Sequence, residues 1–417
     1  MPLFVLFVTA FVDMVGLTMV VPILPYYAKD FGANATTIGV LISAFSIAQL
    51  LVAPGWGRFS DRHGRRPAIL AGLLLTAVAY CLFAVAGSLA ALLLSRLIQG
   101  AGGGTIGVVQ AYVTDATAPD RRTKNLGWLS VVTSLGAVAG PAFGSAMIAL
   151  GGRRAPGFAA AALSVLVALF AARYLKESSE LRHTESHSLP STTTGASAVR
   201  RVLVHWREPA SRLIWIYAIA IGGFYGTIQT TPLLLAGRFQ VTEAHVGYFV
   251  MYLGGMGVII RSLLLGRMVD RLGEARLSRL GVVLLAAGLA VTGVATNYPG
   301  LVLGLTLMPI GTAFLFPCIT GLLSRVVPSN ERGLYMGVQH TFGGVSRVAF
   351  PVAAGFLMDH AGIGVPFWVS GLLVLATFPL TAALSNYALD RHRTAGDALP
   401  SALDEITGEF PTAAETK

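Results

Sequence analysis

Residues 57–66 read GRFSDRHGRR, and residues 266–275 read GRMVDRLGEA. Aligning the two segments pairs Asp61 with Asp270, Arg62 with Arg271 and Gly64 with Gly273. Further along the chain, two more landmarks recur at almost the same spacing: Gly127 with Gly337, and Pro141 with Pro351. Distant landmarks that share nearly one spacing are hard to obtain by chance, so the sequence predicts two similar halves.

The composition of the chain indicates the solvent around these halves. Of 417 residues, 54% are hydrophobic and only 12% are charged, which is about half of the ~25% charged residues of a typical soluble domain. The mean hydropathy of +0.69 agrees with this. Lipid is therefore the expected solvent, and twelve spanning helices of ~20 residues would occupy roughly 240 residues and leave short loops.

Apolar segments of spanning length lie between clusters of charged residues, Pro and Gly. We expect helices, because the strands of a membrane barrel would alternate in hydrophobicity over ~10 residues. The first segment lacks the basic start of a signal peptide and contains Asp13, so it is interpreted as a span. The expected spans are 3–28, 37–57, 68–87, 89–113, 125–150, 156–175, 210–236, 244–266, 277–296, 299–324, 333–357 and 364–387.

The expected fold is an all-α integral membrane protein of two six-helix bundles. The bundles are 1–175 and 208–388, with a cytoplasmic linker at 176–207 and a polar tail at 389–417. The linker is rich in Ser, Thr and His, a composition typical of a flexible segment. Its end, RRVLVHWR at 200–207, is either a short helix on the anionic inner leaflet or a solvated linker end.

The distribution of Lys and Arg predicts the orientation. With both termini in the cytoplasm, the great majority of the 30 Lys and Arg residues fall in cytoplasmic segments, as the positive-inside rule requires. This asymmetry explains the net charge of +10 without a nucleic-acid partner. The exceptions are Lys29, Arg153, Arg154 and Arg238 in outer loops, and Arg96, Arg261 and Arg347 within spans.

Three further motifs lie in predicted spans: Asp13-x2-Gly16-x5-Pro22-x2-Pro25 in the first, Arg96-x2-Gln99-Gly100 in the fourth and Gly136-x3-Gly140-Pro141-x2-Gly144 in the fifth. Together with the motif at 57–66, they resemble the major facilitator superfamily, and within it the drug:proton antiporters with twelve spans. The resemblance covers nearly the whole chain and implies multidrug efflux, with antibiotic resistance as its consequence.

The charged motif at 57–66 lies at a helix end, and the resemblance implies a conformational latch. It would hold the outward-open state and break on inward opening. Asp61 would lie near the N-terminus of a neighbouring helix, where an anion is favoured by ~0.3–1 kcal/mol, and Asp115 would pair with Arg65 or Arg66. The alternative, topogenic charge, requires neither Asp61 nor the glycines. The predicted latch residues are Gly57, Asp61, Arg62, Gly64, Arg65, Arg66, Asp115, Asp270 and Arg271.

Asp13 is the only carboxylate well inside the first bundle, and Arg96 is the only interior cation there. An ionised carboxylate in lipid is costly unless it binds a proton or a cation. We hypothesise that the two form a proton-coupling pair, in which protonation of Asp13 releases Arg96. A static Asp–Arg contact between two helices is the alternative.

The small residues of the fifth span allow close helix contact. The resemblance implies that this antiporter motif, Gly136, Gly140, Pro141 and Gly144, restricts leakage in an exporter; ordinary tight packing is the alternative. The chain departs from the tetracycline exporters, because its third span has no acid at 76–80 and its second bundle has no mid-span Asp or Glu. Tetracycline is therefore not the expected substrate.

Arg261 and Arg347 lie within spans of the second bundle, where an unpaired cation costs at least ~2.5 kcal/mol at mid-bilayer. Either they face a central cavity and favour anionic or zwitterionic substrates, or they bind backbone carbonyls or an Asp of the loop motif. His340 titrates near neutral pH by residue type, although a lone His in a helix is often structural. The predicted substrate-cavity residues, a mixture that suits amphipathic molecules, are Gln99, Tyr217, Phe224, Tyr225, Gln229, Phe314, Gln339, His340, Arg261 and Arg347.

The expected function is proton-driven export of small amphipathic molecules across the cell membrane by alternating access. The sequence has no GxxxxGK[ST] phosphate loop and no evident nucleophile–base pair, and Cys81 and Cys318 lack metal-ligand spacing. We therefore expect no ATP-driven pump, enzyme, cofactor or metal site, and a monomer whose coupling ion is the proton. Alternatives are a sugar-efflux or symport carrier of the same fold and a membrane sensor that transports nothing.

Overall fold

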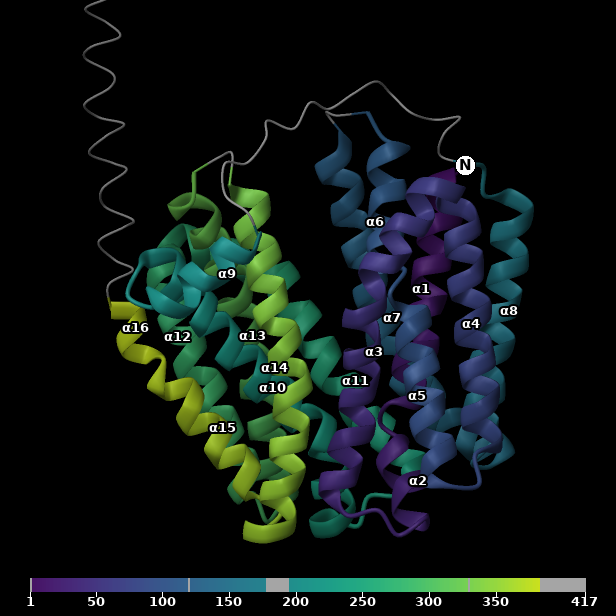
Figure 1. Ribbon diagram of the computed structural model, residues 1–417. Helices are drawn as coiled ribbons and strands as arrows, with labels where there is room; N and C mark the ends of the chain where they lie inside the picture. The colour runs from purple at the N-terminus through teal and green to yellow at the C-terminus, as the bar shows by residue number, and fades with distance from the viewer. Residues whose placement is uncertain (1, 119–120, 178–194, 329–330, 383–417) are drawn as a thin grey trace, which may run out of the picture.

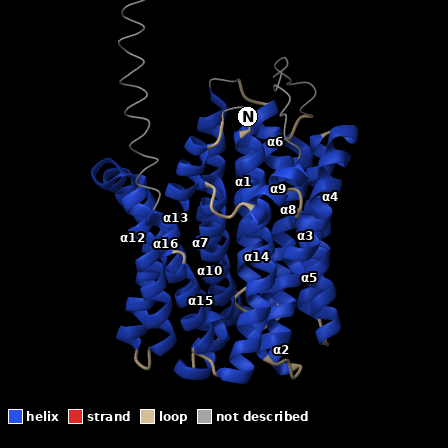
Figure 2. Cartoon of the chain, turned by 60° about the vertical axis from the view of Figure 1, so that its left-hand side comes forward, coloured by secondary structure: helices blue, strands red, loops and turns tan. Residues whose placement is uncertain are grey.

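The computed structural model describes residues 2–118, 121–177, 195–328 and 331–382, and these residues form helices without strands (Figure 2). The predicted tail and residues 178–194 of the predicted linker lie outside them. The first half contains α1 (Pro2–Val20), α2 (Leu24–Asp30), α3 (Ala35–His63), α4 (Arg65–Val85), α5 (Leu89–Gly103), α6 (Ile106–Asp115), α7 (Arg122–Gly151) and α8 (Ala155–Tyr174). The second half contains α9 (Gly195–Val204), α10 (Pro209–Phe239), α11 (Glu243–Ile260), η3 (Arg261–Leu265), α12 (Gly266–Val294), α13 (Tyr298–Val326), α14 (Arg332–Ala361), α15 (Val365–Ala376) and α16 (Phe378–Ala382).

These helices account for the twelve predicted spans. Within the described residues, ten segments are long and apolar enough to cross a membrane. One of them, Glu243–Val294, is 52 residues long and contains the predicted eighth and ninth spans. Gly273 interrupts it with a φ of 73°, where the chain turns back. The shorter apolar segment Val365–Thr381 lies in the predicted twelfth span, 364–387, whose last residues are outside the described part of the chain.

The two predicted halves are two bundles that stand side by side (Figure 1). α3 packs on α14, and α7 packs on α11, across the boundary between them. In the sequence repeat, α11 corresponds to α3 and α14 corresponds to α7. The two contacts between the halves are therefore equivalent, as expected for a duplicated fold.

The repeated motif forms the same turn in both halves. Gly64 separates α3 from α4 with a φ of 98°, and the aligned Gly273 has a φ of 73°. Backbone in this region favours glycine, because any side chain would clash. The two aligned glycines therefore let each motif reverse the chain within one residue.

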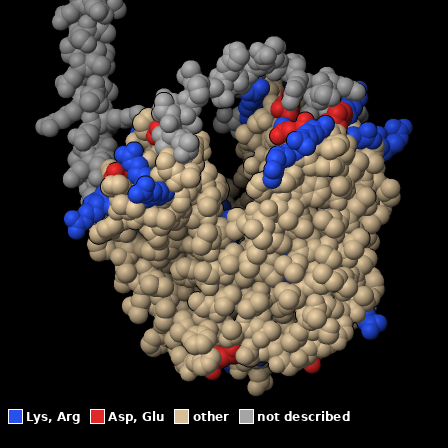
Figure 3. Space-filling model, viewed as in Figure 1, with Lys and Arg blue, Asp and Glu red and all other residues tan. Residues whose placement is uncertain are grey.

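The end of the molecule that carries these turns is named the basic end, and the opposite end is named the far end. Lys and Arg gather on the rims of both halves at the basic end (Figure 3). The same view shows a hollow between the two rims. The basic end therefore separates the halves, whereas the far end joins them.

Hydrogen bonds between the halves close the far end. Asp359 of α14 accepts hydrogen bonds from the backbone N–H groups of Ala35 at 2.9 Å and Thr36 at 2.8 Å, at the start of α3. The hydroxyl of Tyr26 donates to the carbonyl oxygen of Val241 at 2.8 Å. The molecule is thus open at one end and closed at the other.

α9 lies inside the predicted linker and packs on the second half. Its residues Ala198 and Val202 are buried, and the indole N–H of Trp215 donates to the carbonyl oxygen of Val202 at 3.2 Å. A helix is observed up to Val204, as one of the two interpretations of 200–207 required, whereas its expected place on the anionic inner leaflet stays a prediction. Its apolar face lies on α10 and α14.

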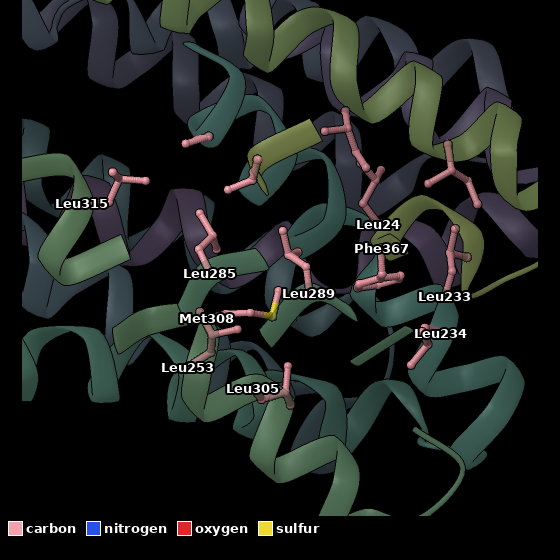
Figure 4. Packing of buried hydrophobic residues seen from close by; sticks show 14 of the residues in the cluster. Leu24, Leu233, Leu234, Leu253, Leu285, Leu289, Leu305, Met308, Leu315 and Phe367 are labelled. Atoms are coloured by element: carbon pink, nitrogen blue, oxygen red, sulfur yellow. The ribbon is translucent and has the colours of Figure 1, made fainter. Parts of the chain in front are cut away.

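The core of the second half is built from apolar side chains of several helices. Figure 4 shows Leu285 and Leu289 of α12 beside Met308 of α13 and Phe367 of α15, all fully or almost fully buried. In lipid such helices associate through close packing rather than through the hydrophobic effect. This packing holds α12, α13 and α15 of the second half together.

The predicted antiporter motif brings α7 against α1, the helix that carries Asp13. A methyl group added at Gly140 would lie 2.6 Å from the carbonyl oxygen of Val15, and α1 crowds Gly136 and Gly144 in the same way. Residues four apart share one helix face. The three glycines are therefore the surface through which α7 contacts α1.

We expect Gly140→Ala to destabilise the protein by ~1–3 kcal/mol, the usual cost of overpacking, because the methyl group would push α7 away from α1. Gly127 lies on the same helix with nothing within 4 Å of an added methyl group, so Gly127→Ala should leave the melting temperature unchanged. The melting temperatures of both variants in detergent check this. Equal values would show that the close contact is unnecessary.

Candidate functional site

A cavity of about 480 Å³ lies between the two halves and is named the central cavity. Residues of α1, α3, α5, α6 and α7 line it from the first half, and residues of α10, α11, α13 and α14 line it from the second. Because the far end is closed and the hollow lies at the basic end (Figure 3), access to this cavity is from the basic end.

A second space of about 610 Å³, named the Asp13 chamber, lies inside the first half. Asp13 is the only Asp or Glu among the described residues that line either space. Three residues, Met14, Ile106 and Thr133, line both spaces. They form a thin wall between the carboxylate and the central cavity.

Arg96 lies at the central cavity, on the other side of this wall. Its side chain is buried, it donates a hydrogen bond to Oε1 of Gln99, and its guanidinium lies 5.0 Å from the centre of the Phe45 ring. In the described chain, no ion pair or hydrogen bond joins it to Asp13. The expected direct pair is therefore absent from this state, whether as a coupling pair or as a static contact, because the two residues face different spaces.

Buried polar atoms without partners gather beside these residues. The hydroxyl of Tyr80, Nε of Arg96 and Nε2 of Gln99 are buried and have no partner at good hydrogen-bond geometry, although the Tyr80 hydroxyl lies near the Gln99 amide. A methyl group added at Gly16, one turn after Asp13, would lie 3.3 Å from that hydroxyl. Buried polar atoms are rarely left unpaired, so this cluster differs from ordinary helix packing. Tyr80 was not among the predicted site residues, because the only feature expected to matter at 76–80 was the lack of an acid.

The second half contributes part of the predicted set to the central cavity. Phe224, Tyr225, Gln229, Arg261 and Arg347 line it. The guanidinium of Arg347 lies 5.6 Å from the centre of the Tyr225 ring. Two cations and two aromatic rings from one half therefore face the same space.

Five predicted cavity residues lie outside this lining. Phe314 and Gln339 are buried in the packing of the second half, and His340 is exposed. The remaining two are Gln99, held by Arg96, and Tyr217, packed edge-on against a neighbouring ring. The expectation for these five differs from the structure because an apolar helix does not reveal which side faces a cavity.

At the basic end, Arg65 binds two of the three carboxylates of the predicted latch, Asp61 and Asp115. Its Nη1 donates to Asp61 at 2.6 Å, and its Nε donates to Asp115 at 3.1 Å. Glu177 accepts a hydrogen bond from the backbone N–H of Arg65 at 2.7 Å, and Arg66 donates to a carbonyl oxygen of α8. Asp115 was expected to pair with Arg65 or Arg66, and it pairs with Arg65. The latch was also expected to break on inward opening, yet both ion pairs of Arg65 are intact while the basic end is open. The expected place of Asp61 at a helix N-terminus is not seen, because the open basic end leaves its side chain 62% exposed.

The second half has a counterpart of this ion pair with the charges exchanged. Glu274, which aligns with Arg65 in the repeat, binds Arg325 at 2.6 Å. Arg325 lies at the end of α13, as Asp115 lies at the end of α6. Asp270 and Arg271, the other predicted latch residues here, are exposed. The repeat spacing could have revealed this pair from the sequence.

The sequence model of the Major Facilitator Superfamily matches residues 6–264 and, again, residues 253–405. The chain belongs to this family. It is 28% identical over 373 residues to Multidrug resistance protein 2 of Bacillus subtilis, with 89% of this chain and 92% of that protein covered. It is 26% identical over 386 residues to Tetracycline resistance protein, class B, of Escherichia coli, with 90% and 95% covered.

Solved structures of this superfamily's fold agree. A human organic anion transporter is 26% identical, with a TM-score of 0.66 and with 91% of this chain and 98% of that chain covered. A bacterial homologue of the human lysosomal transporter Spinster, in an inward-facing state, has a TM-score of 0.77 at 14% identity, with 92% and 96% covered; this likeness concerns the fold alone. The predicted family and fold are confirmed, and the chain is a multi-pass membrane transporter.

Proposed function

We propose that this transporter exports small amphipathic organic molecules in exchange for protons, with the basic end in the cytoplasm of the cell. Relatives named for multidrug and tetracycline resistance support export, and the positive-inside rule supports the orientation. The central cavity is then open to the cytoplasm and closed to the outside. That is the state in which an exporter loads its substrate, and no cofactor or second subunit is required.

The observation that carries the proposal is the isolation of Asp13. It has no hydrogen bond or ion pair in the described chain, and it is the only carboxylate at either space. An ionised carboxylate without a partner in apolar surroundings is costly, so Asp13 exchanges a proton as its access to water changes. The chamber also reaches Thr114, the neighbour of Asp115 at the basic end, which gives the proton an exit to the cytoplasm.

The wall between the two spaces couples the proton to the substrate. Met14 follows Asp13 on α1 and lines both spaces. A substrate that displaces Met14 therefore displaces the helical turn that holds the carboxylate. In this proposal, Asp13 and Arg96 communicate through the wall rather than by direct contact. The ion pairs of Arg65 lie within the first half and are already formed in this open state, so the latch remains a prediction for new contacts made when the basic end closes.

The test uses purified protein in sealed liposomes with two xanthene dyes of opposite charge, fluorescein and rhodamine 6G. An imposed pH gradient should drive at least one dye across the membrane faster than equal pH on both sides, and a protonophore should remove the difference. If each dye moves at the same rate with and without the pH gradient, the proposal is refuted.

Tyr80→Phe tests the cluster beside Asp13. We expect nearly normal stability, because the hydroxyl that is removed has no hydrogen-bond partner in this state. Gradient-driven transport should be about tenfold slower, because in our proposal the hydroxyl donates a hydrogen bond worth ~1.5 kcal/mol to ionised Asp13 in another state of the cycle. The dye assay and the melting temperature measure the two quantities. An unchanged rate would exclude Tyr80 from proton transfer.

A further inference from the structure

We infer that the central cavity binds organic anions. The transport of these anions rests on the proposed function, whereas their binding does not. Arg96, Arg261 and Arg347 line this cavity together with no Asp or Glu. Charges of one sign within apolar walls focus the electric field and concentrate ions of the opposite sign. A cationic substrate would meet three like charges and no counter-charge.

Arg261 and Arg347 are free to bind a ligand. Several arginines of this structure are held by the protein: Arg325 by Glu274 at 2.6 Å, and Arg238 by a backbone carbonyl oxygen at 2.7 Å. Arg261 and Arg347 make no hydrogen bond and no ion pair in the described chain. The alternative that they bind backbone carbonyls or a carboxylate of the loop motif is therefore not observed.

The surroundings of Arg347 favour an aromatic anion. Its guanidinium lies over the ring of Tyr225, and Phe224 lines the cavity beside it. A guanidinium that stacks through its face keeps its N–H edge for two parallel hydrogen bonds to a carboxylate or sulfonate. The rings offer an apolar surface to the rest of the same molecule.

The backbone conformation at Arg261 is a second observation that supports a binding site, independent of the unpaired charges. Arg261 begins the π-helical turn η3, which joins α11 to α12. Such turns are rare and occur frequently at functional sites, because the extra residue changes the direction of the side chains that follow. Here the turn begins at the residue that brings its charge to the cavity.

An anion in this cavity would act on both halves. Arg96 belongs to the first half and is held by Gln99 and Phe45, while Arg261 and Arg347 belong to the second. Repulsion between like charges grows as closure brings them together and removes the water between them, which opposes closure of the basic end. A bound anion removes this repulsion and so favours the closed, outward-facing state.

Export of an anion and export of a cation also differ in the net charge that crosses the membrane. Export of a monovalent anion against entry of one proton is equivalent to the inward movement of two positive charges. The same exchange with a monovalent cation moves no net charge. A potential that is negative on the cytoplasmic side should therefore accelerate anion export and leave cation export unchanged.

The first experiment measures equilibrium binding to the purified full chain by fluorescence polarisation. We expect fluorescein to bind at least about tenfold more tightly than rhodamine 6G, and Arg261→Gln and Arg347→Gln each to weaken fluorescein binding about tenfold. Arg347→Lys keeps the positive charge and should bind fluorescein more tightly than Arg347→Gln does, but less tightly than the unmodified protein. Arg332→Gln removes an exposed charge from the same helix as Arg347 and should change nothing.

The inference would be overturned if rhodamine 6G bound more tightly than fluorescein. It would also be overturned if neither Gln variant changed the affinity for fluorescein. If the Gln variants do not fold, the order of the two dyes on the unmodified protein decides. Proton-driven transport of rhodamine 6G without fluorescein binding would contradict this inference alone. Arginine-dependent fluorescein binding without any response to a pH gradient would contradict the proposed function alone.

Discussion

Asp13→Asn is expected to abolish dye transport driven by a pH gradient, lowering the rate by roughly 100-fold or more, as when a proton-transferring group is removed. Asparagine has nearly the same shape but binds no proton at the pH values of the assay, so the transport cycle loses its driving ion. Dye binding should remain, because Asp13 does not line the central cavity. Exchange of labelled for unlabelled dye at equal pH should also remain, since it needs no net proton movement.

A carboxylate outside both spaces provides the control for this variant. Asp30 lies at the far end and binds Arg153, so Asp30→Asn should keep gradient-driven transport. The two variants are compared in liposomes with equal amounts of inserted protein. Full gradient-driven activity in Asp13→Asn would remove this residue from the coupling mechanism.

Gly247→Ala is expected to open the far end. A methyl group at Gly247 of α11 would overlap the carbonyl group of Pro141 on α7, where the two halves meet. Overpacking of ~1–3 kcal/mol that applies only to the closed state would shift the populations about tenfold or more toward the state open at the far end. Transport should slow accordingly, because the protein then seldom opens its basic end.

Accessibility of the central cavity measures this shift. In a protein with Cys81 and Cys318 replaced by Ser, a cysteine at Gln229 should react with an impermeant maleimide mainly from the basic end, and in Gly247→Ala mainly from the far end. Gly255→Ala on the same helix makes only an ordinary contact at 3.7 Å and should behave like the parent. Labelling from the basic end in both variants would show that the Gly247 contact does not close the far end.

The sequence predicted what depends on repetition and on residue type. The repeated motif placed Gly64 and Gly273 at matching turns, and both have the positive φ that only glycine adopts without strain. Asp115 was expected to pair with Arg65 or Arg66, because it lies at the helix end beside the charged motif, and it pairs with Arg65. Spacing and chemistry were sufficient for these features.

The sequence could not predict which way a buried side chain points. Asp13 and Arg96 are both mid-helix, yet one faces the chamber of the first half and the other faces the central cavity. Helices in lipid are apolar on most sides, so the hydrophobic pattern does not fix their rotation. Phe314 and Gln339 were expected at the cavity for the same reason and are instead buried in the second half.

If the protein exchanges substrate for protons through Asp13, substrate alone should move protons across the membrane. Liposomes that contain the protein and an internal pH dye are prepared at equal pH on both sides, and fluorescein is then added outside. We predict that inward dye movement drives protons outward, so that the interior becomes more alkaline in the unmodified protein and not in Asp13→Asn. If the dye enters at the normal rate and the internal pH does not change, the protein does not exchange its substrate for protons.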